Sequence, residues 1–273
     1  MKLAWVGNSY VYFNDLPSML AAMLATCATI ECTHEQVTPG GERLAGHAKN
    51  PEVARLLDAG NTWDAVVLQD NSAVPGGSDA AALAASHAAL DEYFAPRVER
   101  QTVWIYGTWG HRLGCVYRQH REAYPDYETM QARTTAGCEG YAERLGCRMV
   151  PVGDAFRRVH ELDVAAGVDP LDADSLFSRL YAPDDFHPSR LGSYLSCCCF
   201  YAALTGASPV GTPFRPAERC EHDERMLAAH PSDAVAWAPK PLSEADALAL
   251  QQAAAFAVRG FLRAETTGGC DVL

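Results

Sequence analysis

The chain has 273 residues, of which 48% are hydrophobic and 21% are charged, and its formal net charge is -12. This composition is typical of a folded globular protein and excludes a disordered or collagen-like chain, while the acidic balance disfavours nucleic-acid binding. No stretch approaches the ~18 uncharged apolar residues that span a bilayer, and the N-terminus has no signal-peptide pattern, so we expect a cytoplasmic protein without a membrane partner.

Short apolar runs alternate with amphipathic stretches over most of the chain, a pattern typical of βαβ units. Strands are expected at Lys2–Val6, Thr29–Val37, Ala65–Leu68, Thr102–Tyr106 and Arg148–Val152. Helices are expected at Pro17–Cys27, from Pro51 to a stop at Gly60, and at Asp79–Phe94, Tyr127–Leu145 and Ser189–Leu204. The sequence therefore predicts an α/β protein, a three-layer α/β/α sandwich around a five-stranded parallel sheet.

The C-terminal quarter differs in character from the rest. Residues 209–241 are rich in Pro, His, Asp and Glu without periodicity, which indicates an irregular surface segment. An alanine-rich helix is expected from Ser243 to Arg263, with Ser243 as its N-cap, and the tail Thr266–Leu273 is expected to be loose. We see no internal repeat and predict one domain, 1–273, with residues 206–273 as a C-terminal extension.

The ten cysteines show no pattern of paired C-x-x-C motifs that a structural zinc site requires. We expect them to be small buried side chains in a reducing compartment. Cys27, Cys32 and His34 are an alternative set of metal ligands, but the alternation of a strand from Thr29 explains them as well. We therefore expect neither a metal nor a cofactor.

Ser9 lies directly after the first predicted strand, in Gly7-Asn8-Ser9-Tyr10. Ligands of α/β proteins usually bind where the carboxyl ends of the strands meet, so a serine there is well placed to act as a nucleophile. The alternative is an ordinary turn or cap serine after a glycine that supplies the bend.

His187 follows Asp184 by three residues, just before a predicted helix. A catalytic histidine needs a carboxylate on its second ring nitrogen, and Asp184 can reach back to it within one turn, whereas Asp185 is the weaker candidate. The alternative is a local turn that carries a surface histidine.

Two further loops end predicted strands, Gly40–Gly41 after the second and Asn71 after the third. Glycine and asparagine amides are donors that can stabilise an oxyanion, together with the amide of the nucleophile itself. Each loop alone also fits ordinary turn chemistry. Together the four loops supply a nucleophile, two donors, an acid and a base in chain order.

This order resembles the SGNH hydrolase superfamily, also called GDSL-type esterases and lipases. The resemblance covers residues 2–206, and an uncharacterised subgroup with a Gly-Asn-Ser nucleophile block is especially similar. It is carried by Gly7-Asn8-Ser9-Tyr10, Asn14-Asp15-Leu16-Pro17, Gly40-Gly41-x-x-Leu44-x-x-His47, Trp63-Asp64-x-Val66-Val67-Leu68-Gln69 and His187-Pro188-Ser189-x-x-Gly192-x-Tyr194-Leu195. The resemblance implies a flavodoxin-like sheet, a triad of Ser9, His187 and Asp184, and an oxyanion hole formed by Ser9, Gly41 and Asn71.

Two features depart from the family pattern. Asn8 stands where the family usually has aspartate, which removes a charge beside the nucleophile but no triad member. The subgroup often has glutamine near the third block, so either Gln69 or Asn71 is the side-chain donor, and spacing favours Asn71. In the second block Gly41 fits better than Gly40, although a slip by one residue is an alternative.

Other motifs are missing or ambiguous. The chain lacks the G-x-S-x-G elbow of α/β-hydrolases and the glycine-rich phosphate loops of nucleotide-binding folds. Trp109, His111 and Arg112 follow the fourth strand and are placed to line a substrate pocket, or else are a packed tryptophan with two solvated neighbours. Asp154 fits a helix cap better than a catalytic acid.

The sequence thus predicts a metal-independent serine esterase that cleaves a small acyl ester through an acyl-enzyme. Its substrate is expected to be a small-molecule or glycan ester, with acetyl on a carbohydrate as one candidate. A non-catalytic binding module on the same fold is the alternative. A metal-dependent phosphoesterase would need a carboxylate and histidine cluster that the sequence does not show, and the oligomeric state stays open.

Overall fold

A computed structural model gives the fold of residues 1–58, 60–217 and 219–267, with only the backbone described for 261–267. Five parallel strands form one sheet in the order β2-β1-β3-β4-β5. They are β1 (Lys2–Val6), β2 (Thr33–Val37), β3 (Ala65–Leu68), β4 (Val103–Gly107) and β5 (Arg148–Pro151). The predicted five-stranded parallel sheet is confirmed.

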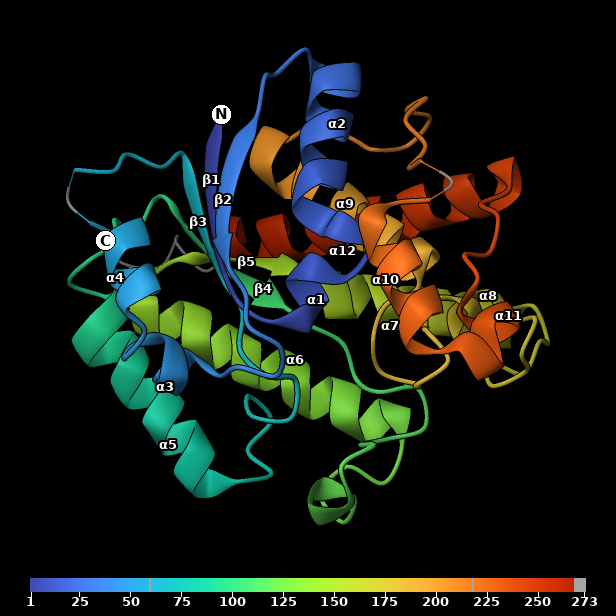
Figure 1. Cartoon of the computed structure of the whole chain (residues 1–273), viewed down its shortest axis with the longest axis horizontal. Helices are drawn as coiled ribbons and strands as arrows, with labels where there is room; N and C mark the ends of the chain where they lie inside the picture. Colours follow the sequence, from blue (N-terminus) through green and yellow to red (C-terminus); the bar gives the residue numbers. More distant parts are fainter. Residues whose placement is uncertain (59, 218, 268–273) are drawn as a thin grey trace.

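Alternate residues along each strand point to opposite faces of the sheet, which gives two cores. In β1, Leu3 and Trp5 belong to one core and Ala4 and Val6 to the other. The first core is closed by α2 (Leu16–Ala28), α7 (Val152–Ala165), α9 (Arg190–Thr205) and α12 (Glu244–Thr267). The second is closed by α3 (Leu44–His47), α4 (Pro51–Leu56), α5 (Ala80–Ala88), the π-helix η2 (Ala89–Phe94) and α6 (Tyr127–Leu145). Figure 1 shows this three-layer arrangement.

Side-chain caps start several of the predicted helices. The side chains of Asn50, Asp79 and Ser189 each accept a backbone hydrogen bond from the first turn of α4, α5 and α9, respectively. Gly206 ends α9 in the left-handed conformation at φ +71, which glycine adopts at little cost. These caps explain why the starts of these three helices were readable from the sequence.

The structure corrects four predictions of local structure. The helix that begins at Pro51 ends at Leu56, before the stop expected at Gly60. Thr29 caps the end of α2 at φ +56, so the second strand begins only at Thr33. Asp154 is not a helix cap: α7 begins behind Pro151, and Asp154 pairs with Arg157 at 2.9 Å within the first turn. The segment 209–241 contains the helix α10 (Glu221–Ala229), η4 (Pro231–Asp233) and α11 (Ala234–Trp237).

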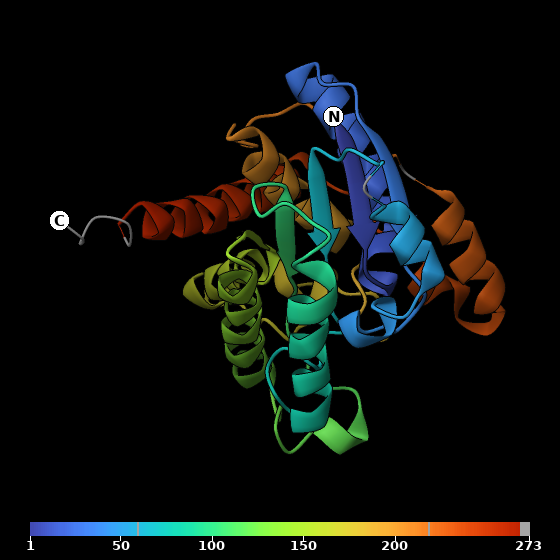
Figure 2. The same ribbon diagram turned by 90° about the vertical axis from the view of Figure 1, so that its left-hand side faces the viewer.

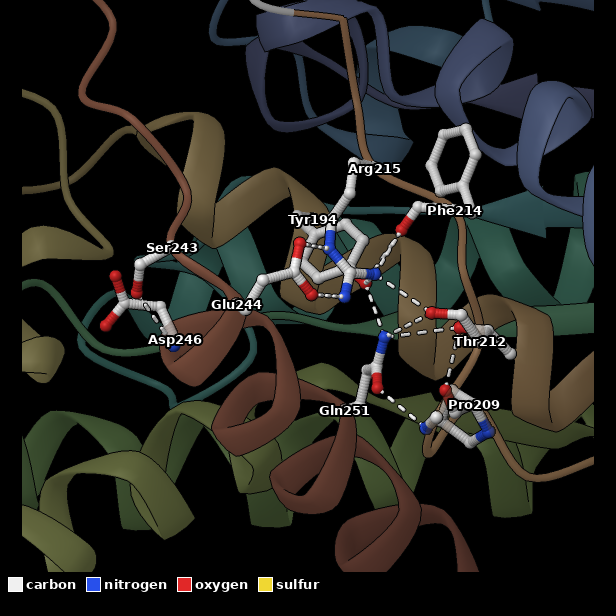
Figure 3. A network of polar contacts seen from close by, with 10 residues as sticks. Tyr194, Pro209, Thr212, Phe214, Arg215, Ser243, Glu244, Asp246 and Gln251 are labelled. Atoms are coloured by element: carbon white, nitrogen blue, oxygen red, sulfur yellow. Dashed lines mark hydrogen bonds and ion pairs between the residues drawn. The ribbon is translucent and has the colours of Figure 1, made fainter.

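The C-terminal extension is anchored to the sandwich by a buried glutamine. Gln251 of α12 donates to the Tyr194 hydroxyl at 2.8 Å and to Thr212 O at 3.1 Å, and it accepts from Gly211 N at 2.8 Å (Figure 3). In Figure 2 the red α12 extends to one side of the molecule, and the orange α10 and α11 lie on the other. The predicted tail lies outside the described residues except at 266–267, which belong to α12.

The order of the strands determines where a site can form. The chain passes from β1 to β2 on one side and then crosses β1 to reach β3 on the other, so the crevice at the carboxyl ends of β1 and β3 is the switch point of the sheet. Short elements occupy this edge. They are α1 (Ser9–Tyr12), η1 (Phe13–Asp15), η3 (Arg118–His120) and α8 (Leu176–Arg179).

Candidate active site

The loop after β1 holds Ser9 in a fixed place. A Cβ at Gly7 would lie 2.6 Å from Gln69 Oε1, so only glycine fits between the strand and that side chain. Asn8 N donates to the same Gln69 oxygen at 2.8 Å, and Asn8 Nδ2 donates to Glu42 O at 3.0 Å. Ser9 is the first residue of α1, where a backbone amide has no partner inside the helix. Its amide is therefore free of helical pairing.

Ser9, His187 and Asp184 form one hydrogen-bonded line. His187 Nδ1 lies 2.7 Å from Asp184 Oδ2, and His187 Nε2 lies 2.8 Å from Ser9 Oγ. An ionised carboxylate can only accept, so Nδ1 carries the proton and Nε2 accepts from the Ser9 hydroxyl. The structure thus brings together three residues that the sequence placed in one triad.

The Asp184 carboxylate is held by its own turn. Its Oδ1 accepts from His187 N at 3.0 Å and from Phe186 N at 3.3 Å. Burial alone would raise the pKa of Asp184, but the hydrogen bonds from the His187 ring and from these two amides outweigh burial and lower the pKa below its ordinary value. The carboxylate therefore stays charged at neutral pH and can stabilise an imidazolium.

Two phenylalanines enclose the His187 ring. Phe13 stacks on it with ring centroids 3.9 Å apart and planes 3° apart, and Phe186 lies at 4.0 Å on a tilted plane. These contacts leave the imidazole little freedom to rotate away from Ser9.

The helix α10 contacts the site through Phe13, the residue that stacks on His187. His222 packs against Phe13 at a centroid distance of 4.1 Å, and burial and the nearby Arg225 charge lower the pKa of His222 to about 4. The side chain of His222 is 5% exposed. Sequence reasoning missed this contact, because the segment 209–241 carries no motif and its helix is short.

The loops after β2 and β3 contact each other and also Asn8, the residue before Ser9. Gly41 has φ +71, a left-handed conformation that favours glycine, whereas a Cβ at Gly40 would meet the Tyr12 hydroxyl at 3.1 Å. Asn71 Nδ2 donates to Gly41 O at 3.4 Å, and Asn71 Oδ1 accepts from Ala73 N at 3.1 Å. The amide nitrogen of Asn71 thus lies on the side of the glycine loop.

Gln69 and Asn71 play different parts. Gln69 is 1% exposed, and both ends of its amide are used, by Asn8 N and by Asp70 O. It therefore supports the nucleophile loop from behind and does not face the crevice. Of the two alternatives, Asn71 is the one placed beside Gly41.

Two buried residues that the sequence did not single out as functional hold these loops together. His47 Nε2 donates to Gly7 O at 2.8 Å, and its side chain is fully buried. Asp70 Oδ1 accepts from Leu44 N at 3.1 Å and from Asn71 N at 2.8 Å, which joins the second loop to the third. The block Gly40-Gly41-x-x-Leu44-x-x-His47 was the available signal for His47.

The loop after β4 does not line a pocket with Trp109 or His111. Trp109 is fully buried, stacked between Tyr10 at 4.4 Å and Phe156 at 4.3 Å, so it packs as the second interpretation expected. His111 is also fully buried and donates from Nε2 to Ser72 Oγ at 2.9 Å, so both interpretations of it are wrong. Burial, with the His187 charge, lowers the pKa of His111 to about 3.

Within the described residues, no three His, Cys, Asp or Glu side chains come together as metal ligands. His34 Nε2 lies 3.3 Å from Ser18 Oγ, and Cys27 and Cys32 pack against the hydrophobic core. In the same residues, no helix combines the length and apolarity needed to cross a bilayer.

Comparison with solved structures identifies the fold family. A DUF4886 family protein from Bacteroides uniformis superposes with a TM-score of 0.71 at 16% identity, over 95% of each chain. A proposed SGNH hydrolase from Slackia heliotrinireducens gives 0.54 at 27% identity, over 74% of this chain and 97% of its own. An acetylxylan esterase from Geobacillus stearothermophilus, in a catalytic mutant, gives 0.52 at 13% identity, over 75% and 94%. No protein-family model and no curated protein sequence matches the chain.

The protein is an α/β/α sandwich in which Ser9, His187 and Asp184 lie in one hydrogen-bonded line at the carboxyl edge of the sheet. The chain has the fold of the SGNH hydrolase superfamily, which its sequence blocks resemble. Only 5% of the chain lies outside the Bacteroides match, so that protein also shares most of the C-terminal extension.

Proposed function

We propose that this protein is a serine esterase that hydrolyses small acyl esters through an acyl-enzyme on Ser9. The observation that carries the proposal is the unbroken line from Asp184 through His187 to Ser9, with contacts of 2.7 and 2.8 Å. Structural neighbours that are SGNH esterases and lipases support ester hydrolysis in general.

In the proposed mechanism, His187 Nε2 takes the hydroxyl proton of Ser9 as Oγ attacks the ester carbonyl. Asp184 stabilises the imidazolium that forms. The oxyanion is held by the amides of Ser9 and Gly41 and by the Asn71 side chain. His187 then gives its proton to the leaving alcohol, and a water molecule repeats the steps in reverse to release the acid.

The proposed substrate is a small acyl ester, with acetyl on a carbohydrate as the leading candidate. One structural neighbour is an acetylxylan esterase, which supports a glycan ester as the substrate class. The alternative of a non-catalytic binding module would not require His187 to be locked between Phe13 and Phe186 in line with Ser9.

The test compares wild type with Ser9→Ala on p-nitrophenyl acetate and longer acyl esters, with EDTA present. We expect measurable hydrolysis by wild type, insensitivity to EDTA, and loss of at least about 10³-fold in the variant. A fluorophosphonate should label wild type at Ser9 and leave the variant unlabelled. Equal rates in both proteins, together with no labelling of Ser9, would establish the binding module instead.

A further inference from the structure

Asp185 is a strained residue in the middle of the triad's turn. It has φ +68, in the left-handed region, which L residues seldom adopt although aspartate enters it more often than most. Its two neighbours in the turn, Asp184 and Phe186, supply the carboxylate and one of the amides bound to it. Such a conformation persists only when surrounding contacts hold it, so the contacts of Asp185 determine the geometry of the triad.

Arg112, in the loop after β4, holds Asp185 at both its side chain and its backbone. The guanidinium Nη2 lies 2.6 Å and Nε 2.8 Å from Asp185 Oδ1. The backbone amide of Arg112 donates to Asp185 O at 2.9 Å. Asp185 N in turn donates to Ala182 O at 3.1 Å. Rotation of the Asp185 backbone out of the left-handed region would break these contacts.

The guanidinium is itself fixed in place. Its Nη1 donates to Ser178 Oγ at 3.1 Å and to Leu171 O at 3.4 Å. The Arg112 side chain is 21% exposed, so its pairing with Asp185 is only partly screened by solvent. The guanidinium of Arg112 is therefore held by Ser178 and Leu171 in addition to its contacts with Asp185.

The same loop also holds the other residues around the turn. Trp109 Nε1 donates to Phe186 O at 3.1 Å, and the Tyr181 hydroxyl donates to Gly110 O at 2.7 Å. Since Trp109 is locked between two stacked rings, the loop after β4 is a rigid support for the turn.

We propose that Arg112 is a positioning residue: by holding Asp185 in its left-handed conformation, it sets Asp184 and His187 at hydrogen-bonding distance from each other and from Ser9. This inference rests on the proposed function of Ser9. Arg112 acts through Asp185, and a displacement of His187 by about 1 Å would cost on the order of 10²-fold in rate.

The first experiment replaces the guanidinium with an apolar chain, Arg112→Met. We expect kcat to fall about 10²-fold with KM nearly unchanged, and the rate of fluorophosphonate labelling of Ser9 to fall by a similar factor. The matched control is Arg179→Met. Arg179 binds Asp246 through two nitrogens, at 2.7 and 3.1 Å, and its side chain is 22% exposed. The control loses a comparable ion pair and should keep its kcat.

A rescue experiment separates backbone conformation from general loosening. Glycine adopts the left-handed region freely and alanine does not. Adding Asp185→Gly to Arg112→Met should recover at least about tenfold in kcat, whereas adding Asp185→Ala should recover nothing. In crystal structures, the distance from Ser9 Oγ to His187 Nε2 should lengthen in Arg112→Met and return in the glycine double variant, a readout that needs no substrate.

Several outcomes would overturn the inference. One is a kcat for Arg112→Met within twofold of the Arg179→Met control. Another is a raised KM with unchanged kcat in Arg112→Met. A third is an equal recovery of kcat in the two double variants. A raised KM alone would make Arg112 a substrate contact. If wild-type Ser9 is not labelled, the proposed function fails, and an unmoved turn in the Arg112→Met crystal structure overturns the positioning role separately.

Discussion

Replacing Asp184 with asparagine tests the triad most directly, because the structure dictates how the new amide must lie. Asp184 Oδ1 accepts from two backbone amides, those of His187 and Phe186. The asparagine oxygen must keep that place, since an NH₂ group there would leave two donors unsatisfied at roughly 1–3 kcal/mol each. The NH₂ group then occupies the position of Oδ2 and faces His187 Nδ1.

The consequence is a change of tautomer at His187. Nδ1 must accept a hydrogen bond from the amide, so the proton moves to Nε2, which then donates to Ser9 and cannot take its proton. A base in the wrong tautomer costs about 10⁴-fold in kcat in the serine-protease triad, or roughly 5.4 kcal/mol in activation free energy. We expect the same loss for Asp184→Asn, with the fold intact because both backbone hydrogen bonds remain.

The assay is kcat on the best p-nitrophenyl ester, together with the rate of fluorophosphonate labelling. Asp154→Asn is the control, since Asp154 pairs with Arg157 on α7 and is predicted to have no part in catalysis. Retention of more than about a tenth of wild-type kcat by Asp184→Asn would refute the assignment of the tautomer. A loss in Asp154→Asn as large as that in Asp184→Asn would refute the choice of catalytic acid.

Two further predictions concern the oxyanion hole and acid stability. Asn71→Ala should lower kcat by about 10²–10³-fold, measured on the same ester, and a loss under threefold would exclude Asn71 as an oxyanion donor. Burial lowers the pKa of His222 to about 4 and that of His111 to about 3, whereas a histidine in the unfolded chain has a pKa of ~6.5. Between the folded and unfolded pKa values, the unfolded state binds more protons than the folded state. The free energy of unfolding therefore falls as the pH drops below ~6.5. His222→Phe should therefore lose less Tm than wild type between about pH 7 and about pH 4.5 in thermal melts, and an identical decrease would contradict the role of His222.

Much of the fold was predictable because its signals are local. The predicted helix Tyr127–Leu145 coincides with α6, since Asp126 caps one end and Gly146, at φ +60, ends the other. The strands β1 and β3 were equally clear, as short apolar runs buried on both faces. The helix α10 was missed because its cap is Cys220, an unusual capping residue, and its apolar side chains are few.

In the candidate site, too, contacts between residues close in sequence were predictable and contacts between distant segments were not. The Asp184 to His187 contact lies within one turn, so the spacing of two residues was enough to predict it. The pairing of Arg112 with Asp185 and the packing of His222 on Phe13 join segments far apart in the chain, and no local spacing encodes them. His111 was misjudged for a related reason: its burial comes from tertiary packing, which a loop sequence does not reveal.

During synthesis of the chain, Ser9 is added long before His187. Ser9 and His187 are 178 positions apart in the chain. At about 5–20 residues per second, synthesis takes roughly 10–35 s to pass from one to the other. Throughout that interval the growing chain carries a serine without its base, so incomplete chains that end before the turn cannot hydrolyse esters by this mechanism. Activity in a translation reaction would consequently report the arrival and docking of the last third of the polypeptide.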